Sequence, residues 1–357
     1  MSGRVAVILF NLGGPAGRET VKPFLYRFFS DPNIIALPPP LRQMLAALIA
    51  RRRSRREAES SYRHLNWQSP LLANSQAQAV ALEAALNAGG QGNYKVFVCM
   101  RYWKPLATEV ARQVKAWQPE RIVLLPLYPQ YSTTTTRSSF QNWRRASRKA
   151  GLKTPTSAIC CYPLNEGFIK ASEANIAPVY RKAIEQSRLH NLKPPRLLFS
   201  AHGLPEKIVK GGDPYQWQCE ESARAIVNAL GIPKLDWQIC YQSKVGRLRW
   251  IGPSTVEALE NAAIDRIPVV IYPHAFVSEH VETLVELDIE CRHMADRIGI
   301  PYLARVGTVG ASPLFIDGLK DMVLRHIDRA DIAPDTGPRL CPAGRSRCCL
   351  SDPTARL

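Results

Sequence analysis

The stretch RVAVILFNLGGP at positions 4–15 places a continuous apolar run directly before a Gly-Gly-Pro turn, and RLLFSAHGLP at 196–205 repeats this arrangement. Apolar runs without alternation are typical of parallel strands whose two faces are both covered. Six further runs of this kind follow: KVFVCM (95–100), RIVLLPLY (121–128), SAICCY (157–162), DWQICY (236–241), PVVIYP (268–273) and PYLARV (301–306). Helix-like segments lie between the runs, so we expect an α/β fold built on parallel sheets.

The segments between the runs carry helical periodicity. Apolar residues recur at three-to-four spacing in 107–117 and 219–231. A further helix is predicted at 74–88, where Asn74 can serve as the N-cap and Gly89-Gly90 ends the pattern.

The eight apolar runs divide into two sets of four that resemble each other. The first run of each set enters a glycine–proline turn, and the third ends in LYPQYS (127–132) or IYPHAFVS (271–278). This weak internal symmetry indicates a duplicated unit, and 357 residues suit two domains. We predict domains at 1–165 and 166–330 and a Cys-rich tail at 331–357, with the last helix, 312–328, able to pack back on the first domain.

Composition excludes several classes of protein. No apolar run reaches the roughly 18–20 residues that span a bilayer, and from the pattern of the N-terminal residues we expect no signal peptide. Nine cysteines without a secretory signal do not indicate a disulfide scaffold, so we expect a cytoplasmic protein. The net charge of +17 favours an anionic partner. Because no zinc-finger spacing or RNP-type motif is present, we expect no nucleic-acid binding.

The segment 31–69 interrupts the first set of runs. After Pro38-Pro39-Pro40 it carries one apolar stripe at helical spacing and then a run of arginines: Leu41, Met44, Leu45, Leu48 and Ile49, followed by Arg51, Arg52, Arg53, Arg55 and Arg56. Two interpretations fit this pattern. The helix could pack its stripe on the core, or it could touch a membrane with apolar side chains inserted and arginines on anionic headgroups.

Ligands of open parallel sheets bind past the carboxyl ends of the strands. The GGPAG turn at 13–17 is not G-x-G-x-x-G and no G-K-[ST] follows it, so we predict no P-loop. Polar and aromatic residues expected at the strand ends are candidates for the site: Asn11, Arg101, Tyr102, Gln130, Tyr131, His202, Ser243, Lys244, Phe276, His280 and Glu282.

Three glutamates after the strand at 268–273 form a further candidate feature. Glu282, Glu286 and Glu290 are spaced i, i+4, i+8 and would share one face of a helix, where like charges repel by a few tenths of a kcal/mol per pair. They either form a solvated acidic face or line a crevice in which they pass a cation or protons. His280 and Glu282 cannot lie side by side on a regular helix, so a joint role requires an irregular first turn.

These residues fall in segments that resemble the ferrochelatase family, in the family's order from Arg4 to about His326. The segments are NLGGP (11–15), MRYWKPL (100–106), LYPQYSTTTT (127–136), SAHGLP (200–205), GDPY (212–215), YQSKVGRLRWIGPST (241–255) and HAFVSEHVETLVELD (274–288). The resemblance implies two Rossmann-like domains, each a four-stranded parallel sheet flanked by helices, with an active-site cleft between them. It also implies a lyase that inserts ferrous iron, its substrate metal, into protoporphyrin IX without ATP, as the last step of haem biosynthesis.

The resemblance further assigns roles to individual residues. His202 and Glu282 match the pair that handles iron and protons, with His280 and Glu286 beside them. The residues that match the porphyrin contacts are Leu12, Arg53, Tyr62, Ser69, Arg101, Tyr102, Trp250 and Phe276. Three of them, Arg53, Tyr62 and Ser69, belong to the segment at about 31–69, which matches the family's porphyrin lip and is called the lip segment below. The chain departs from many relatives before Ser69, where HLNWQ (64–68) replaces a glycine-rich stretch.

The chemistry of metal insertion independently requires such residues. Two pyrrole protons must leave before the ring nitrogens bind iron, and a histidine with carboxylates behind it can accept and export them. The protein must also release the iron to the porphyrin. Oxygen and nitrogen ligands bind iron more weakly than thiolates and therefore permit this release.

The tail cysteines have two interpretations. They are either free thiols or ligands of a [2Fe-2S] cluster, which the resemblance implies and which needs four ligands. Cys341, Cys348 and Cys349 supply three, and Thr133 stands where animal relatives have the fourth. Cys160 or Cys161 could replace it, and since adjacent strand residues face opposite ways we favour Cys161 alone.

Two other functions compete with this interpretation. A coproporphyrin ferrochelatase or a cobalt chelatase would share the same residues. A non-enzymatic haem-binding or iron–sulfur protein would not need the three glutamates. The arginine-rich segment 31–69 suggests a peripheral position on the inner face of an anionic membrane, and no pattern indicates an oligomeric state.

Overall fold

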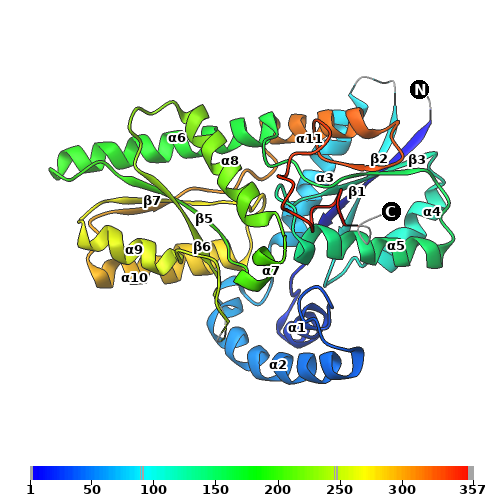
Figure 1. The fold of residues 1–357 in the computed structure, drawn as a ribbon, viewed down its shortest axis with the longest axis horizontal. Coiled ribbons are helices and arrows are strands. Elements are labelled where there is room, and N and C mark those ends of the chain that lie inside the picture. Colours follow the sequence, from blue (N-terminus) through cyan, green and yellow to red (C-terminus); the bar gives the residue numbers. More distant parts are fainter. Residues whose placement is uncertain (1–2, 89, 91, 245, 247, 353–357) are drawn as a thin grey trace. The chain divides into compact units, whose positions relative to one another are not determined.

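The computed structural model describes residues 3–88, 90, 92–244, 246 and 248–352 (Figure 1). The chain forms two compact units. The first comprises Met1–Tyr162, Leu319–Pro342 and Arg347–Leu357, and the second comprises Pro163–Gly318 and Ala343–Ser346. Helix α11 (Pro313–His326) starts in the second unit and ends in the first. Among the described residues, no helix is both long enough and apolar enough to cross a bilayer.

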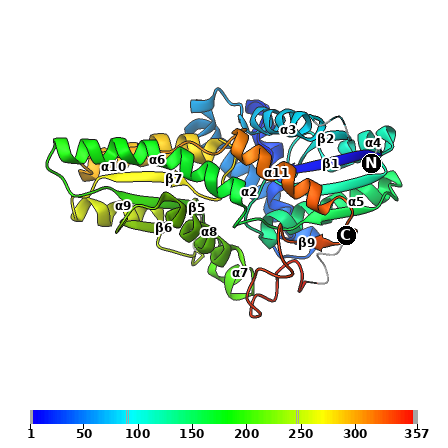
Figure 2. The ribbon, with the colours of Figure 1, turned by 90° about the horizontal axis from the view of Figure 1, so that it is seen from above.

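The first unit contains a five-stranded parallel sheet of order β2-β1-β3-β4-β9. Its strands are β1 (Arg4–Asn11), β2 (Asn93–Met100), β3 (Arg121–Pro126), β4 (Thr156–Ile159) and β9 (Ile332–Ala333). The four longer strands confirm the first set of apolar runs. The fifth strand was not predicted, and Figure 2 shows it near the end of the chain, beside β4 in the sheet order.

Helices cover both faces of this sheet. Alternate residues of β1, such as Ile8 and Phe10, pack with α4 and α5, while α3 contacts β1 and β2. The helices are α1 (Val21–Phe29), α2 (Pro39–Ser60), α3 (Leu71–Asn87), α4 (Ala107–Trp117) and α5 (Ser138–Ala150), with short turns η1 (Arg18–Thr20), η2 (Tyr62–Leu65) and the π-helical η3 (Thr133–Arg137). The predicted N-cap of α3 was wrong, because the helix starts at Leu71 after Pro70 and already includes Asn74.

The second unit contains a four-stranded parallel sheet of order β6-β5-β7-β8. Its strands are β5 (Arg196–His202), β6 (Trp237–Gln242), β7 (Val269–Pro273) and β8 (Leu303–Arg305). Figure 1 shows α6 (Glu166–Leu189) and α8 (Tyr215–Leu230) on one face, with α9 (Thr255–Ile264) and α10 (Cys291–Ile298) on the other. The short α7 (Glu206–Lys210) follows β5, and the π-helical η4 (Glu282–Glu290) leads into α10.

Helix α2 exposes part of the apolar stripe that the sequence predicts. Leu41, Met44 and Leu48 are 51%, 67% and 65% exposed, whereas Leu45 and Ile49 are half-buried and Ala46 and Ala50 are buried. The helix therefore packs on the protein through small residues and two members of the stripe, while the other three large apolar side chains face solvent. An ordinary surface helix would bury more of its stripe in the core.

Candidate active site

A histidine–glutamate pair lies at the carboxyl end of β5. His202 is the last residue of the strand, and its Nδ1 is 2.8 Å from Glu282 Oε2 at the start of η4. A carboxylate can only accept a hydrogen bond, so the neutral His202 ring carries its proton on Nδ1 and keeps a lone pair on Nε2. The side chains of His202 and Glu282 are 37% and 24% exposed, so the pair remains accessible.

His280 joins this pair because the chain is irregular before η4. It lies ahead of the helical segment, and its Nε2 is 3.7 Å from Glu282 Oε2. The Phe276 ring packs against the His280 ring, with ring centroids 4.7 Å apart and the ring planes tilted by 46°. The irregular first turn that a joint role requires is therefore present. The π-helical turns that follow are rare in proteins and occur mostly at functional sites.

Glu286 is fixed by the end of β6. Its carboxylate accepts hydrogen bonds from the Ser243 backbone N–H at 2.7 Å and from Ser243 Oγ at 2.6 Å. Gln242 Nε2 donates to Glu286 Oε2 at 3.3 Å and to the Glu282 carbonyl at 3.1 Å, so it bridges the two glutamates. Glu290, in contrast, is exposed.

Three acid–base groups of this cluster, His202, Glu282 and Glu286, have different proton affinities. Burial alone would lower the pKa of His202, but the Glu282 carboxylate outweighs it and raises the pKa above its ordinary value. Burial would raise the pKa of Glu282, but His202 and then His280 hold it well below its usual range. Burial and the Glu282 charge raise the pKa of Glu286 despite the Ser243 hydrogen bonds. Glu282 therefore stays ionised, while His202 and Glu286 take up protons more readily than usual.

A pocket of about 520 Å³ opens beside this cluster in the second unit. Gly203, Gln242, Lys244 and Trp250 are among the residues that line it. A Cβ atom at Gly203 would lie 3.2 Å from the Trp250 ring and 3.0 Å from the Gln242 carbonyl, so glycine permits this close approach.

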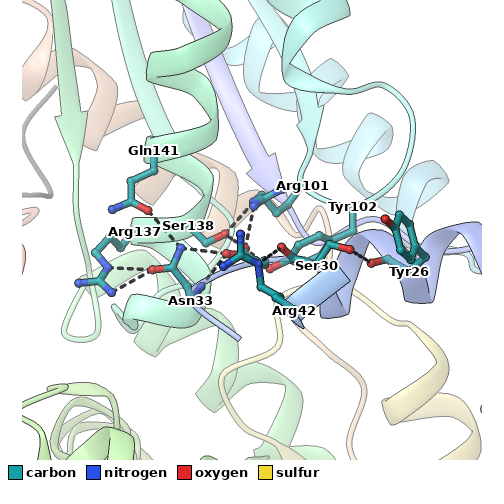
Figure 3. Close-up of polar contacts among 10 residues, drawn as sticks. Tyr26, Ser30, Asn33, Arg42, Arg101, Tyr102, Arg137, Ser138 and Gln141 are labelled. Atoms are coloured by element: carbon teal, nitrogen blue, oxygen red, sulfur yellow. Dashed lines mark hydrogen bonds and ion pairs between the residues drawn. The ribbon is translucent and has the colours of Figure 1, made fainter. Parts of the chain in front are cut away.

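In the first unit, Arg101 and Tyr102 surround the buried carboxylate of Asp31. Asp31 Oδ2 accepts from Arg101 Nη2 at 2.7 Å, from Tyr102 Oη at 2.8 Å and from Ser138 Oγ (Figure 3). Arg101 Nε also donates to Ser138 Oγ at 2.6 Å. Burial would raise the pKa of Asp31, but Arg101 and these donors lower it overall. Tyr102 is fully buried, so it supports Arg101 and presents no open surface of its own.

Leu12 and Ser69 lie close to this network. The Leu12 carbonyl accepts from the Tyr102 backbone N–H at 2.9 Å. Ser69 donates its backbone N–H to Pro15, and a Cβ atom at Gly14 would lie 2.5 Å from Ser69 Cβ. The glycine of the GGP turn thus allows Ser69 to approach the end of β1.

Arg53 on α2 and Tyr62 on η2 both belong to the lip segment, 31–69. The Arg53 guanidinium lies over the Phe29 ring at 5.5 Å from its centroid. Tyr62 is buried and begins η2. Arg51, Arg52 and Arg55 are exposed, while the side chain of Arg56 lies outside the described residues.

The tail cysteines gather around the end of β4. Cys160 and Cys349 form a disulfide whose Cα atoms are 6.4 Å apart, and Cys161 Sγ lies 3.7 Å from Cys160 Sγ. Both residues follow the end of β4 at Ile159, so strand alternation does not separate their side chains. The expected opposite orientation of the two side chains was therefore wrong. Cys160 meets the tail through Cys349, while Cys161 as the internal cluster ligand stays a prediction. Cys341 hydrogen-bonds Cys348 and, as the largest of several causes, lowers the Cys348 pKa to about 6.

Some members of these clusters were not predicted. Asp31, Ser138 and Gln242 form central contacts, yet the sequence marks none of them by charge pattern or periodicity.

In the part of the chain that the structure describes, no group of three or more His, Cys, Asp or Glu side chains is arranged to hold a metal ion.

Comparison with known proteins places these features in one family. The family model "Ferrochelatase" matches residues 4–327. A ferrochelatase of Phenylobacterium zucineum is 46% identical over 355 residues, which cover 99% of this chain and 100% of that protein. One from Wolbachia sp. subsp. Drosophila simulans is 48% identical over 319 residues, or 89% and 98% of the two chains. The solved structure "SirB from Bacillus subtilis with Fe3+" has a similar fold, with a TM-score of 0.53 at 11% identity over 92% of this chain and 96% of that one. The chain belongs to the ferrochelatase family, the lyases of haem biosynthesis.

Proposed function

We propose that the chain inserts ferrous iron into protoporphyrin IX, with His202 accepting the pyrrole protons. The observation that carries this proposal is the 2.8 Å contact between His202 Nδ1 and Glu282. It leaves the Nε2 lone pair of the neutral ring available to a proton or to iron. Because Glu282 stabilises the protonated ring, it makes His202 a stronger base than an isolated histidine.

The proton then needs a path away from the porphyrin. Glu286, whose pKa is raised, is the next acceptor, and Gln242 holds its carboxylate beside the backbone carbonyl of Glu282. The donors of this cluster are carboxylate oxygens and imidazole nitrogens, which bind ferrous iron weakly enough to release it to the macrocycle. His202 and Glu282 can each supply a ligand to the iron, but His202 Nε2 has one lone pair and binds either iron or a proton at any step, so each proton must pass on before Nε2 binds again.

The macrocycle itself requires apolar contacts and a cation. Phe276 and Trp250 offer aromatic surface beside the histidine cluster, and Leu12 offers apolar surface in the first unit. The Arg101 guanidinium is held by Asp31 and suits an anionic propionate. Tyr62, Ser69 and Arg53 belong to the lip segment that would border the bound ring.

The test is an anaerobic assay with purified protein, ferrous iron and either protoporphyrin IX or coproporphyrin, followed by absorbance of the metallated product. We expect faster insertion into protoporphyrin. A preference for coproporphyrin, or for cobalt over iron, would favour the competing chelatases. Binding of haem without any insertion would favour a non-enzymatic protein.

We propose further that Cys160, Cys341, Cys348 and Cys349 hold a [2Fe-2S] cluster. All four sulfur-bearing side chains are buried, and the low pKa of Cys348 favours the thiolate that such a cluster needs. When Cys160 and Cys349 are reduced, the same sulfurs that pair in the disulfide become available as ligands, so the ligand group that the described residues lack in the disulfide state can assemble. A cluster here would cross-link the tail to the end of β4. Cys161 is the alternative internal ligand.

We also propose that α2 binds an anionic membrane surface, which would make this otherwise cytoplasmic protein peripheral to the inner face of the membrane. The exposed side chains Leu41, Met44 and Leu48 form one apolar stripe, and exposed arginines follow it. An apolar stripe beside basic residues binds the interface between headgroups and acyl chains.

A further inference from the structure

The hydrogen bonds around Asp31 continue towards the end of the chain through Asn33. Asp31 Oδ1 accepts from the Asn33 backbone N–H at 2.8 Å and from Asn33 Nδ2 at 3.0 Å. Asn33 Nδ2 also donates to Gln141 Oε1 at 3.1 Å. These bonds fix the orientation of the Asn33 amide, and its Oδ1 faces Arg137 (Figure 3).

Arg137 connects Asn33 to the tail. Its Nε and Nη2 donate to Asn33 Oδ1 at 3.1 and 2.9 Å, and its Nη1 lies 2.6 Å from Asp352 Oδ2. The side chains of Arg137 and Asp352 are 17% and 9% exposed, so solvent screens this ion pair weakly. A planar guanidinium holds its donors in a fixed geometry, so the position of Asp352 determines how Arg137 meets Asn33.

Asp352 is in turn fixed by the cysteines. Its backbone N–H donates to the Cys348 carbonyl at 2.9 Å, and so does that of Ser351. Cys349, within the same turn, is joined to Cys160 at the end of β4. This turn is therefore anchored by a sulfur atom on one side and by a carboxylate on the other.

We infer that Asp352 and Arg137 are positioning residues, which hold the Arg101 guanidinium in place for the porphyrin through Asn33 and Asp31. The inference rests on the proposed role of Arg101 in porphyrin binding. The tail would thus contribute to porphyrin binding, whereas the groups of the histidine cluster handle iron and protons. Disturbing the tail weakens porphyrin binding while the histidine cluster and its handling of iron stay intact.

The test compares Asp352→Ala with the matched control Asp331→Ala. Asp331 pairs with Arg329 at the surface, where its side chain is 57% exposed, and it takes no part in the network. In the full-length protein, we expect Asp352→Ala to raise the Kd for protoporphyrin about three- to tenfold. Residues that share one hydrogen-bond network commonly show coupling energies that correspond to changes of this size. Asp352→Asn, which keeps one acceptor, should fall between. The KM for iron and the kcat at saturating porphyrin should not change.

Two further measurements separate positioning from a general loss of stability. Backbone hydrogen exchange of residues 31–37 should accelerate in Asp352→Ala and not in Asp331→Ala. In an Arg101→Lys background, Asp352→Ala should raise the Kd no further, because its effect passes through Arg101.

Several results would overturn the inference. If hydrogen exchange of residues 31–37 is unchanged in Asp352→Ala, Asp352 does not act on Asp31 and Asn33. If the increases in Kd caused by Asp352→Ala and Arg101→Lys multiply in the double variant, Asp352 acts by a route that does not pass through Arg101. If Arg101→Lys weakens porphyrin binding but Asp352→Ala does not, the network has a structural role alone. If Arg101→Lys itself leaves the Kd unchanged, the proposed role of Arg101 fails and the inference fails with it.

Discussion

Replacing Glu282 by glutamine tests the histidine–glutamate pair directly. The substitution keeps the size of the side chain and removes the charge that faces His202 Nδ1 at 2.8 Å. A hydrogen bond to a charged group contributes about 1.5–3 kcal/mol. If that contribution stabilises the protonated His202 of the transition state, the rate should fall roughly 10- to 150-fold.

The pH dependence of the same variant has a definite sign. In the parent protein, Glu282 raises the pKa of His202, and the neutral ring is the form that accepts a proton. Activity should therefore rise with pH through this raised pKa. In Glu282→Gln the burial of His202 remains while the opposing charge is lost, so the pKa falls and the rise in activity moves to lower pH.

The assay is the initial rate of iron insertion under anaerobic conditions at a series of pH values. Glu290→Gln is the matched control, because Glu290 belongs to the same series of glutamates but is exposed. We expect the control to stay within about twofold of the parent, as surface substitutions generally have small effects. Equal, small losses in both variants would mean that the glutamates form a solvated acidic face, and an unmoved pH profile would refute the coupling of Glu282 to His202.

His202→Ala should lower the insertion rate by about 10²–10⁴-fold yet leave porphyrin affinity, measured by absorbance titration, within about twofold; near-parental turnover would exclude His202 as base and ligand. Cys160→Ser protein purified anaerobically should lack the cluster iron and sulfide and unfold at a lower temperature, whereas Cys161→Ser should keep both. Equal iron contents in the two cysteine variants would contradict the assignment of Cys160. Leu48→Ser should weaken binding to vesicles containing anionic phospholipid, and added salt should weaken it further. Leu189→Ser on α6, where the leucine is 74% exposed against 65% for Leu48, should have no effect. If vesicle binding changes neither with salt nor with Leu48→Ser, α2 is not the membrane-binding element.

The strands could be predicted because burial on both faces leaves a continuous apolar run that no other element of this length requires. Each of the eight predicted runs overlaps a strand of the structure. In the run at 157–162, the strand stops at Ile159, three residues before the run ends. The strand Ile332–Ala333 could not be predicted. Two residues carry no periodicity, and their pairing with β4 depends on contacts far away in the chain.

The candidate site was predictable to the extent that residue type and strand position indicate chemistry. His202 and Glu282 each follow an apolar run closely enough to be selected. Asp31 was not, because its partners Arg101 and Ser138 lie 70 and 107 positions away. The π-helical turns of η4 were also hidden, since the i, i+4 spacing of the glutamates is compatible with an ordinary helix.

The return of the chain to its first unit has a consequence for biosynthesis. The second unit is built almost wholly from one uninterrupted stretch, 163–318, whereas the first also needs residues beyond 318. Domains usually fold in the order in which the ribosome releases them. Here the earlier-made unit must wait for β9 and the cysteine turn, so its sheet edge at β4 stays uncovered while the later-made unit can already fold. An unpaired edge is a site of aggregation, so a nascent chain stalled near residue 320 should depend on chaperones more than the finished protein does.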